Sequence, residues 1–297
     1  MAERISFYEH IASNKRKTYF LIAIVIGFII FLGYVIGLLF LTPVIGVILA
    51  VIVGILFTLF AYYTGDNLVL TSVGAREATK QEFPHLWHTV EGLSIAAGIP
   101  MPKIYVVDDP NPNAFATGRD PKHAAVTVTT SLMEIMNRQE LEGVIAHELS
   151  HIRNYDIRYM MLTTVLIGLV VLLADFMVRA MFFSGGNRDR EGSLNLVLIG
   201  VALVFAILSP IFAQLIVFAV SRKREYLADA SGAMITRYPP GLAGALKKLK
   251  DHKVNPKTKL NNKAVEHLYI SNPFKNAKSW LSTHPDINDR IKKLEAM

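Results

Sequence analysis

The feature that most constrains this chain is a stretch from Thr18 to Gly65 that contains no charged side chain. At about 20 residues per span, it is long enough for two transmembrane helices, with a turn at Thr42 and Pro43. A secretory signal peptide fits less well, because its apolar region covers only roughly 7–15 residues and no convincing cleavage site follows. The sequence predicts a polar leader over residues 1–17 and a transmembrane hairpin over residues 18–65.

A second pair of apolar runs lies in the later half of the chain. The runs from Tyr159 to Ala174 and from Gly192 to Ser221 are uncharged, and together they predict a second hairpin over residues 159–220. Asp175 and Arg179 close the first run at helical spacing, so they form either an ion pair at the interface or part of a transport pathway. The chain is 52% hydrophobic, which agrees with four membrane helices in total.

Basic residues flank the two predicted hairpins on one side. Residues 15–17 precede the first span and residues 222–224 follow the last one, and all six are lysine or arginine. By the positive-inside rule, both termini and the polar segments at 66–158 and 221–297 are cytoplasmic, in a multi-pass protein of the cell membrane. The net charge of +7 does not indicate nucleic-acid binding, because no basic stripe with interleaved aromatic residues occurs.

The polar segment before the second hairpin contains the sequence HELSH, an H-E-x-x-H motif. In a helix, His147 and His151 lie one turn apart on the same face, where two imidazoles can hold a divalent ion. Glu148 lies beside the metal rather than on it, which suits a carboxylate that takes a proton from water. The chain has no cysteine, so its other metal ligands must be histidine or carboxylate. The alternative is an amphipathic helix with two incidental histidines.

Local signals support a helix through this motif. Asn137 is a favourable N-cap, and Glu140 completes a capping-box pattern. Five apolar residues follow at helical spacing: Leu141, Val144, Ile145, Leu149 and Ile152.

The residues upstream of the motif predict a mixed α+β domain. Pro84 to Ala97 has the pattern of an amphipathic helix that ends before Gly98. Lys103 to Val107 indicates a strand, while Asn113–Gly118 and His123–Thr130 indicate a β-hairpin. An extended strand beside a zinc helix offers backbone groups to a peptide substrate, whereas the same hairpin without the motif is ordinary scaffold.

Two histidines leave a catalytic zinc ion one protein ligand short. Just beyond the last apolar run, Glu225 and Asp229 are four residues apart and share one face of a helix. One carboxylate can bind the metal while the other accepts a proton from a ligand imidazole. Glu225 is the favoured ligand, and the alternative is that it pairs with the adjacent basic cluster.

Together these motifs resemble the M48 family of integral-membrane zinc metalloproteases. The resemblance covers nearly the whole chain: the first hairpin, NAFATG at residues 113–118, HELSH, the second apolar pair, EYLAD at residues 225–229 and a closing HP…RI..L element at residues 284–294. HELSH followed by EYLAD is the specific part of this pattern, and the closing element is weaker.

The resemblance implies a zincin-like α+β fold of the gluzincin type with one zinc ion per chain. It implies Glu225 as the third zinc ligand beside His147 and His151, Glu148 as the catalytic glutamate, and Asp229 as support for a ligand. It also implies proteolysis of misfolded or damaged membrane proteins. The expected partners are therefore polypeptide substrates and the lipid bilayer.

The residues predict a mechanism of peptide hydrolysis. Zinc lowers the pKa of a bound water to about 7, Glu148 removes its proton, and the hydroxide attacks a peptide carbonyl. His284 is a candidate for stabilising the oxyanion, with a surface or structural role as an equal alternative. Asn113 either contacts the substrate backbone or stabilises a turn. Because His151 and Glu225 lie only a few residues from the second hairpin, the site is expected within roughly 10–15 Å of the membrane.

Two other functions remain open from the sequence. One is a non-proteolytic membrane zinc protein that acts as a scaffold or chaperone adaptor, although a structural zinc site has no need of a base at Glu148. The other is a transporter, which only Asp175 favours.

Overall fold

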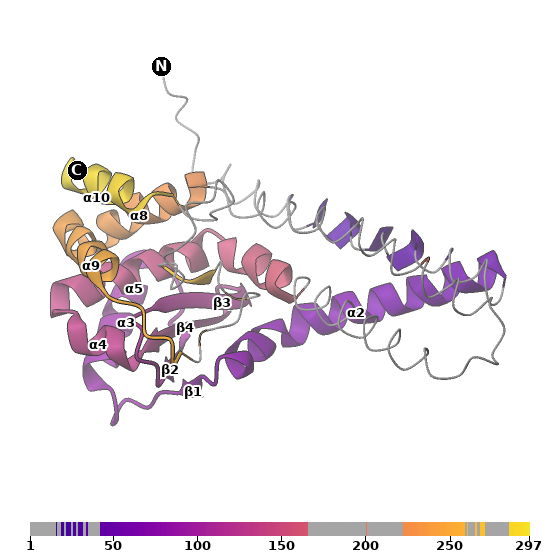
Figure 1. Cartoon of the computed structure of the whole chain (residues 1–297), viewed down its shortest axis with the longest axis horizontal. Coiled ribbons are helices and arrows are strands. Elements are labelled where there is room, and N and C mark those ends of the chain that lie inside the picture. The colour runs from indigo at the N-terminus through magenta and orange to yellow at the C-terminus, as the bar shows by residue number, and fades with distance from the viewer. Residues whose placement is uncertain are drawn as a thin grey trace, which may run out of the picture.

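The computed structural model describes residues 42–165, 222–258 and 285–297, together with residues 16, 19–20, 22–24, 26–27, 29–31, 34, 200, 260, 265 and 268–270. Figure 1 shows a body of packed helices and strands, from which a long arm containing α2 (Pro43–Ser72) extends. Most of the first predicted span, most of the second predicted hairpin and His284 lie outside the described residues.

The arm helix α2 begins where the sequence predicts a turn. The Thr42 hydroxyl accepts a hydrogen bond from the Ile45 amide, and Pro43 takes a first-turn position where its missing N–H costs nothing. The most apolar 18-residue window of α2 has a mean hydropathy of 3.0 and is only 22% buried. α2 is therefore long and apolar enough to span a membrane.

The helix continues beyond Gly65, where the sequence analysis ends the apolar segment. Asp66 and Asn67 are compatible with a helix, and the last two turns bury Val69 and Leu70 against the sheet. The polar residues thus end the apolar surface of α2 without ending the helix.

A four-stranded sheet forms the centre of the body, with the strand order β1-β2-β4-β3. β2 (Lys103–Val107) pairs in parallel with β4 (His123–Thr129), whereas β1 (Arg76–Glu77) and β3 (Ala114–Asp120) run antiparallel to their neighbours. The predicted strand and hairpin are confirmed, although β3 extends two residues beyond Gly118. Gly118 has a φ of +135°, and a Cβ there would collide with the backbone of β4.

Each face of the sheet has its own apolar core. One face packs against α3 (Pro84–Ala97) and α5 (Arg138–Arg153) through residues such as Val126 and Leu149. The opposite face, which includes Phe115, packs against the end of α2. The predicted helix at residues 84–97 is confirmed at both ends.

The helix α5 carries the H-E-x-x-H motif through the middle of the body. Its predicted capping box is present, because the Asn137 side chain accepts from the Glu140 amide at 2.9 Å and the Glu140 carboxylate accepts from the Asn137 amide at 2.8 Å. α8 (Arg222–Thr236) and α9 (Pro239–Asp251) cover α5 on the side away from the sheet (Figure 1). The motif is therefore enclosed rather than displayed on the surface.

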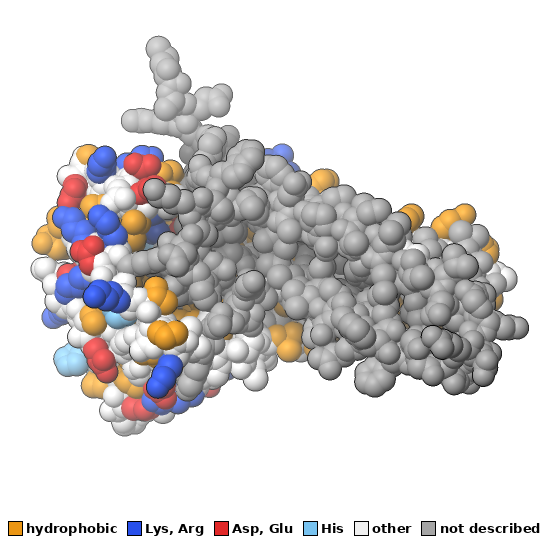
Figure 2. Space-filling model, viewed as in Figure 1, with side chains coloured by type: hydrophobic (Ala, Val, Ile, Leu, Met, Phe, Trp, Pro, Cys, Tyr) orange, Lys and Arg blue, Asp and Glu red, His pale blue; other side chains and the backbone are white. Residues whose placement is uncertain are grey.

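The two parts of the molecule have different surfaces. Figure 2 shows mixed basic and acidic side chains over the body, whereas the coloured side chains on the arm are mainly hydrophobic. The exposed apolar side chains of α2 are Val44, Ile45, Ile48, Leu49, Ile52, Val53, Ile55, Leu56, Leu59, Phe60, Tyr63 and Leu68. A contiguous surface of this kind is typical of contact with lipid.

Candidate metal centre

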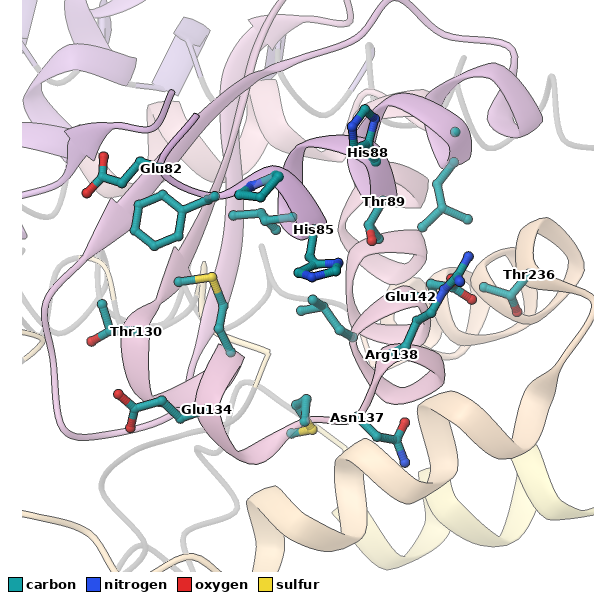
Figure 3. Close-up of a pocket in the computed structure, with 18 of the residues that line it drawn as sticks. Glu82, His85, His88, Thr89, Thr130, Glu134, Asn137, Arg138, Glu142 and Thr236 are labelled. Atoms are coloured by element: carbon teal, nitrogen blue, oxygen red, sulfur yellow. The ribbon is translucent and has the colours of Figure 1, made fainter. Parts of the chain in front are cut away.

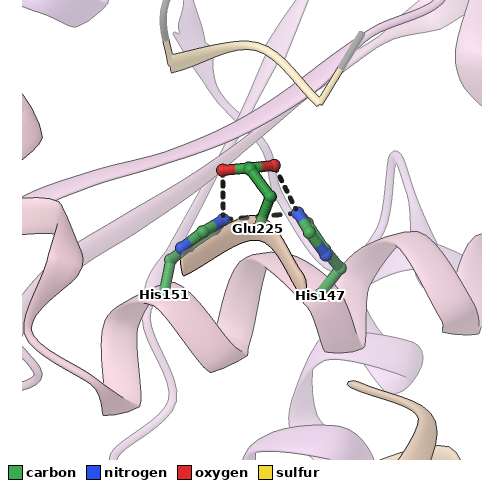
Figure 4. Close-up of side chains that lie close together, drawn as sticks. All are labelled: His147, His151 and Glu225. Atoms are coloured by element: carbon green, nitrogen blue, oxygen red, sulfur yellow. Dashed lines mark hydrogen bonds and ion pairs between the residues drawn. The ribbon is translucent and has the colours of Figure 1, made fainter. Parts of the chain in front are cut away.

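Three side chains from two helices meet in the middle of the body. His147 and His151 lie one turn apart on α5, and Glu225 reaches them from α8 (Figure 4). The Nε2 atoms of the two histidines are 3.3 Å apart. The Glu225 carboxylate oxygens lie 3.7 Å from Nε2 of His147 and 3.6 Å from Nε2 of His151. All three side chains are buried.

This cluster fits a tetrahedral metal ion. Zinc bonds of about 2.0–2.2 Å place neighbouring ligand atoms roughly 3.3–3.6 Å apart. Nδ1 of each histidine faces another carboxylate, so the Nε2 lone pairs point toward each other and toward Glu225. These acceptors repel one another unless a metal ion or a proton lies between them. The residues therefore fit zinc, and three protein ligands leave a fourth position for water or substrate.

His147 is supported by a carboxylate on α8. Nδ1 of His147 lies 3.0 Å from Oδ1 of Asp229, which follows Glu225 by one helical turn. Arg290 of α10 (Ile287–Glu295) binds this carboxylate bidentately, with Nε 2.9 Å from Oδ2 and Nη2 2.7 Å from Oδ1. Burial alone would raise the pKa of Asp229, but the charge of Arg290 holds it well below its usual value.

Arg290 connects this network to the edge of the sheet. Its Nη1 donates to the Ile270 carbonyl at 3.1 Å and lies 3.6 Å from the Glu225 carboxylate. The Ile270 amide donates in turn to the Ala114 carbonyl at the start of β3. Burial would lower the pKa of Arg290, but Asp229 raises it, so the guanidinium stays charged. One buried arginine thus joins a candidate ligand, the edge strand and the C-terminal helix.

His151 is supported by a carboxylate only five residues further along the chain. α5 ends at Arg153, and Tyr155 has a φ of +60°, which turns the backbone before helical structure resumes at residue 156. The turn places Oδ2 of Asp156 3.0 Å from Nδ1 of His151. Burial alone would lower the pKa of His151, but the hydrogen bond that its Nδ1–H donates to Asp156 raises the pKa to about 9 when no metal is bound.

Glu148 lies next to the candidate ligands and is only 1% exposed. Burial raises its pKa, and the charges of His147 and His151 oppose this effect only in part. A carboxylate with a raised pKa is a stronger base than one in water. Glu148 is therefore suited to accept a proton within this site.

A close approach between two helices sets the position of Glu225. Glu225, Asp229 and Gly232 recur at positions i, i+4 and i+7, so they lie on one face of α8. A Cβ at Gly232 would lie 3.0 Å from the amide nitrogen of His147. The missing side chain thus lets α8 lie directly against the motif.

The roles predicted for two other residues, Asn113 and His284, stay predictions. Asn113 is buried immediately before β3, where its side-chain oxygen accepts from the Ala114 amide at 3.0 Å and its carbonyl accepts from the Thr129 amide. These bonds stabilise the strand, and contact between Asn113 and a substrate stays a prediction. His284 lies outside the described residues, so its role also stays a prediction.

Two residues at the centre were not predicted from the sequence. Asp156 follows the motif helix at a spacing that does not share a helix face with His151. Arg290 belongs to the closing element of the sequence pattern, but no spacing connects it with Asp229. The sequence offered only a general expectation of such partners, because ligand histidines usually donate their other ring N–H to a carboxylate or carbonyl.

A groove of about 920 Å³ lies at the N-terminal end of α5 (Figure 3). Its walls come from α3, from α4 (Thr130–Ile135) and from the first turn of α5, and they include His85, Glu134 and Glu142. None of the three candidate ligands lines this groove, so it is separate from the metal centre.

Comparison with known proteins identifies the family. Residues 80–297 match the model described as peptidase family M48. The chain is 48% identical over 294 residues to a protein named protease HtpX homolog from Dictyoglomus turgidum, across 98% of this chain and 95% of the relative. A protein of the same name from Caldanaerobacter subterraneus is 43% identical over 295 residues, across 98% of each chain.

A solved structure has a similar fold. S. mikatae Ste24p matches with a TM-score of 0.51 at 18% identity, over 97% of this chain and 67% of that protein. At this identity the likeness shows the fold alone, a mixed helix-and-sheet peptidase fold. The predicted resemblance is confirmed, and the chain belongs to peptidase family M48.

Proposed function

We propose that this chain is a membrane-embedded, zinc-dependent endopeptidase. The observation that carries the proposal is a buried site in which His147, His151 and Glu225 converge next to Glu148, a carboxylate outside this group. A structural zinc site has no need of such a carboxylate, so a scaffold or adaptor role is less well supported. The relatives named as proteases also favour hydrolysis of peptide bonds.

In this proposal, each of the buried residues has a separate task. His147, His151 and Glu225 hold one zinc ion, which supplies a Lewis acid that acidifies water and polarises a carbonyl. A carboxylate oxygen of Glu148 takes the proton of the attacking water and passes it to the leaving amine. Asp229 and the newly found Asp156 keep the Nε2 atoms directed into the site.

We expect the substrate to lie in an extended conformation along β3. β3 is at one edge of the sheet formed by the described strands and contacts α5, which carries the motif. An extended peptide can add to such an edge through backbone hydrogen bonds. The Ile270 amide already donates a hydrogen bond to the Ala114 carbonyl. We therefore expect the substrate to pair with the part of β3 beyond Ala114, toward Gly118.

The proposed architecture has four membrane helices and a cytoplasmic catalytic domain divided between residues 66–158 and 221–297. α2 supports one span, and the uncharged runs of the sequence support the other three. The basic residues on one side of the hairpins support the cytoplasmic orientation. A site of this kind suits the cytoplasmic parts of misfolded or damaged membrane proteins as substrates.

The test uses the full-length protein and an unfolded casein-like substrate. Zinc-loaded protein should cleave it, whereas chelated protein should not. Zinc-loaded Glu148→Ala should lose roughly 100-fold or more in rate, because general-base catalysis contributes about 10²–10⁴-fold. Glu142→Ala is the matched control, since Glu142 also lies on α5 but pairs with Arg138 at the surface. Substantial cleavage by zinc-loaded Glu148→Ala would contradict the role of Glu148 as the base.

A further inference from the structure

The exposed apolar surface of α2 ends at a pair of tyrosines. Apart from Leu68, which is exposed beyond Asp66 and Asn67, it runs from Val44 to Tyr63, about 20 residues or roughly 30 Å of helix, which matches the hydrocarbon thickness of a bilayer. Beyond Tyr63 the helix joins the core of the body. The rings of Tyr62 and Tyr63 meet edge to face with their centroids 5.2 Å apart. Tyrosine is enriched at the level of lipid headgroups, so this pair marks the expected boundary of the membrane.

Two arginines from other elements lie over these two rings. The guanidinium carbon of Arg119, near the end of β3, is 5.3 Å from the centre of the Tyr63 ring. That of Arg158 is 5.7 Å from the centre of Tyr62 and 5.3 Å from that of Tyr155. Nε of Arg158 also donates to the Arg119 carbonyl. Figure 1 shows that β3 ends where the arm leaves the body. The contacts with the Tyr62 and Tyr63 rings hold both guanidinium groups at this boundary.

No carboxylate neutralises this pair within the part of the chain that the structure describes. No side-chain oxygen of aspartate or glutamate there lies within 4.0 Å of Arg119 or Arg158. Asp120, next to Arg119, instead accepts from the Lys122 and His123 amides and pairs with the His123 ring at 2.9 Å. Burial would raise the pKa of Asp120, but these hydrogen bonds lower it, so its charge is already engaged.

We propose that Arg119 and Arg158 bind the phosphate of an anionic phospholipid. A planar guanidinium group recognises phosphate through paired hydrogen bonds, and both groups are partly buried on aromatic rings that restrict their motion. The position at the end of the apolar surface of α2 favours a lipid over a soluble phosphate. An anionic phosphodiester headgroup such as that of phosphatidylglycerol carries a net negative charge that the two guanidinium groups can neutralise.

The lipid site adjoins the metal centre through one short segment. Arg158 follows Asp156 by two residues in the same helical stretch, and Asp156 holds His151. A headgroup bound at Arg158 therefore holds the start of the helix that orients one candidate ligand. Lipid binding itself does not depend on proteolysis, so it can be measured separately from the proposed function.

The experiment measures lipid binding to full-length, zinc-free Glu148→Ala protein by native mass spectrometry. Phosphatidylglycerol competes with phosphatidylcholine, and the preference is compared with that of a protein that also carries Arg119→Gln and Arg158→Gln. At about 1 kcal/mol for each basic residue near an anionic surface, the double change should lower the preference for phosphatidylglycerol by roughly 30-fold. Lys122→Gln is the matched control, because Lys122 is exposed on the same hairpin and should change the preference by less than about fivefold.

Three outcomes would overturn the proposal. An unchanged preference after the double change would show that the arginines bind no lipid. An equal loss with Lys122→Gln would show diffuse attraction instead of a site. Displacement of phosphatidylglycerol by inorganic phosphate at an equal concentration would assign the site to soluble phosphate. A double variant with Arg119→Lys and Arg158→Lys tests whether the loss comes from misfolding. These changes keep the charge, so the preference for phosphatidylglycerol should be intermediate.

Discussion

His147 and His151 occupy equivalent places in one motif, but their supporting carboxylates have different origins. Nδ1 of His147 faces Asp229 on another helix, and Arg290 from a third helix binds that carboxylate. Nδ1 of His151 faces Asp156, which is five residues later in the same segment. The first contact depends on the packing of distant parts of the chain, whereas the second depends on one turn of the backbone.

This difference connects each candidate ligand to a different part of the molecule. His147 depends on the docking of α10 through Arg290 and Asp229. His151 depends on residues 156–165, whose helix packs so closely on the arm that a Cβ at Gly65 would lie 3.2 Å from the Met161 side chain. The centre thus joins the body to the arm, and its position near the membrane surface stays a prediction.

The largest effect is expected for Arg290→Met. This change leaves Asp229 buried without its counter-charge, which typically costs about 3–5 kcal/mol in the free energy of unfolding. Both stability and zinc affinity should fall, because the support of His147 is lost. Chemical denaturation of the zinc-free protein and its zinc content after loading measure the two effects.

Two control variants sharpen the test of Arg290. Arg290→Lys keeps the charge but not the bidentate contact, so its loss of stability should be smaller. Lys293→Met removes a charge from the same helix, at a side chain that stacks on Tyr226 away from the centre, and should cost about 1 kcal/mol or less. Equal losses in Lys293→Met and Arg290→Met would contradict a special role for Arg290.

The next largest effects are expected for changes to the two supporting carboxylates, Asp229 and Asp156, which can be compared directly. Asp229→Asn and Asp156→Asn should each lower zinc affinity by about 10–100-fold, because each removes the partner of one ligand imidazole. Above about pH 9, where His151 is neutral in the zinc-free protein, Asp229→Asn should destabilise the fold more than Asp156→Asn, because among the described residues it leaves the buried Arg290 with only the Glu225 carboxylate, at 3.6 Å. Competition with a chelator measures the affinities. Equal destabilisation by both changes above about pH 9 would remove the distinction between long-range and local support.

The pH dependence of zinc binding should be determined mainly by the protonation of His151. Without metal, His151 has a pKa of about 9, above its ordinary 6.5, so zinc must displace a proton at neutral pH. Zinc affinity should rise about tenfold per pH unit up to about pH 9, after correction for the chelator, and then level off. In Asp156→Asn this plateau should begin at a lower pH.

The same pKa shift has a consequence for folding in the absence of zinc. Because protonated His151 is stabilised in the folded state, its contribution is complete below about pH 6.5 and is lost as the pH rises to about 9. Melting of the zinc-free protein across this range provides the measurement. An identical pH profile in Asp156→Asn would show that Asp156 does not raise the pKa.

The smallest effect is expected for Gly232→Ala. The added methyl group would lie 3.0 Å from the His147 amide, so α8 must shift by a few tenths of an ångström and carry Glu225 with it. We expect a loss of zinc affinity of roughly tenfold or less, measured by chelator competition. Gly92→Ala is the matched control, since no atom lies within 4 Å of the added Cβ on α3, and alanine should stabilise that helix by about 1 kcal/mol. Equal zinc affinity in both variants would contradict the importance of this close approach.

Features with local signals were predicted well from the sequence. The capping box of α5 and the bounds of α3 depend on residues within a few positions of each other, and the structure contains both. The spacing of Glu225 and Asp229 also predicted their common helix face. The end of α2 was not predicted, because charged residues mark where an apolar surface ends and not where helical hydrogen bonds end.

Two residues of the centre, Asp156 and Arg290, were not predicted from the sequence, and each has a specific physical reason. Asp156 reaches His151 only because Tyr155 adopts a positive φ, which is uncommon for a residue with a side chain and has no signature in the sequence. Arg290 meets Asp229 only after α10 has packed against the rest of the body. Pairwise spacing describes a single helix, whereas these contacts depend on how separate elements come together.

The most direct test of the metal centre is the zinc content of two full-length variants, measured with X-ray absorption at the zinc edge. Glu148→Ala should retain one zinc ion per chain with two imidazole ligands, because Glu148 lies outside the proposed ligand set. Glu225→Ala should lose most of its zinc, because only His147 and His151 remain as ligands. Full zinc occupancy in Glu225→Ala, or loss of zinc from Glu148→Ala, would contradict the assignment of His147, His151 and Glu225 as the ligands.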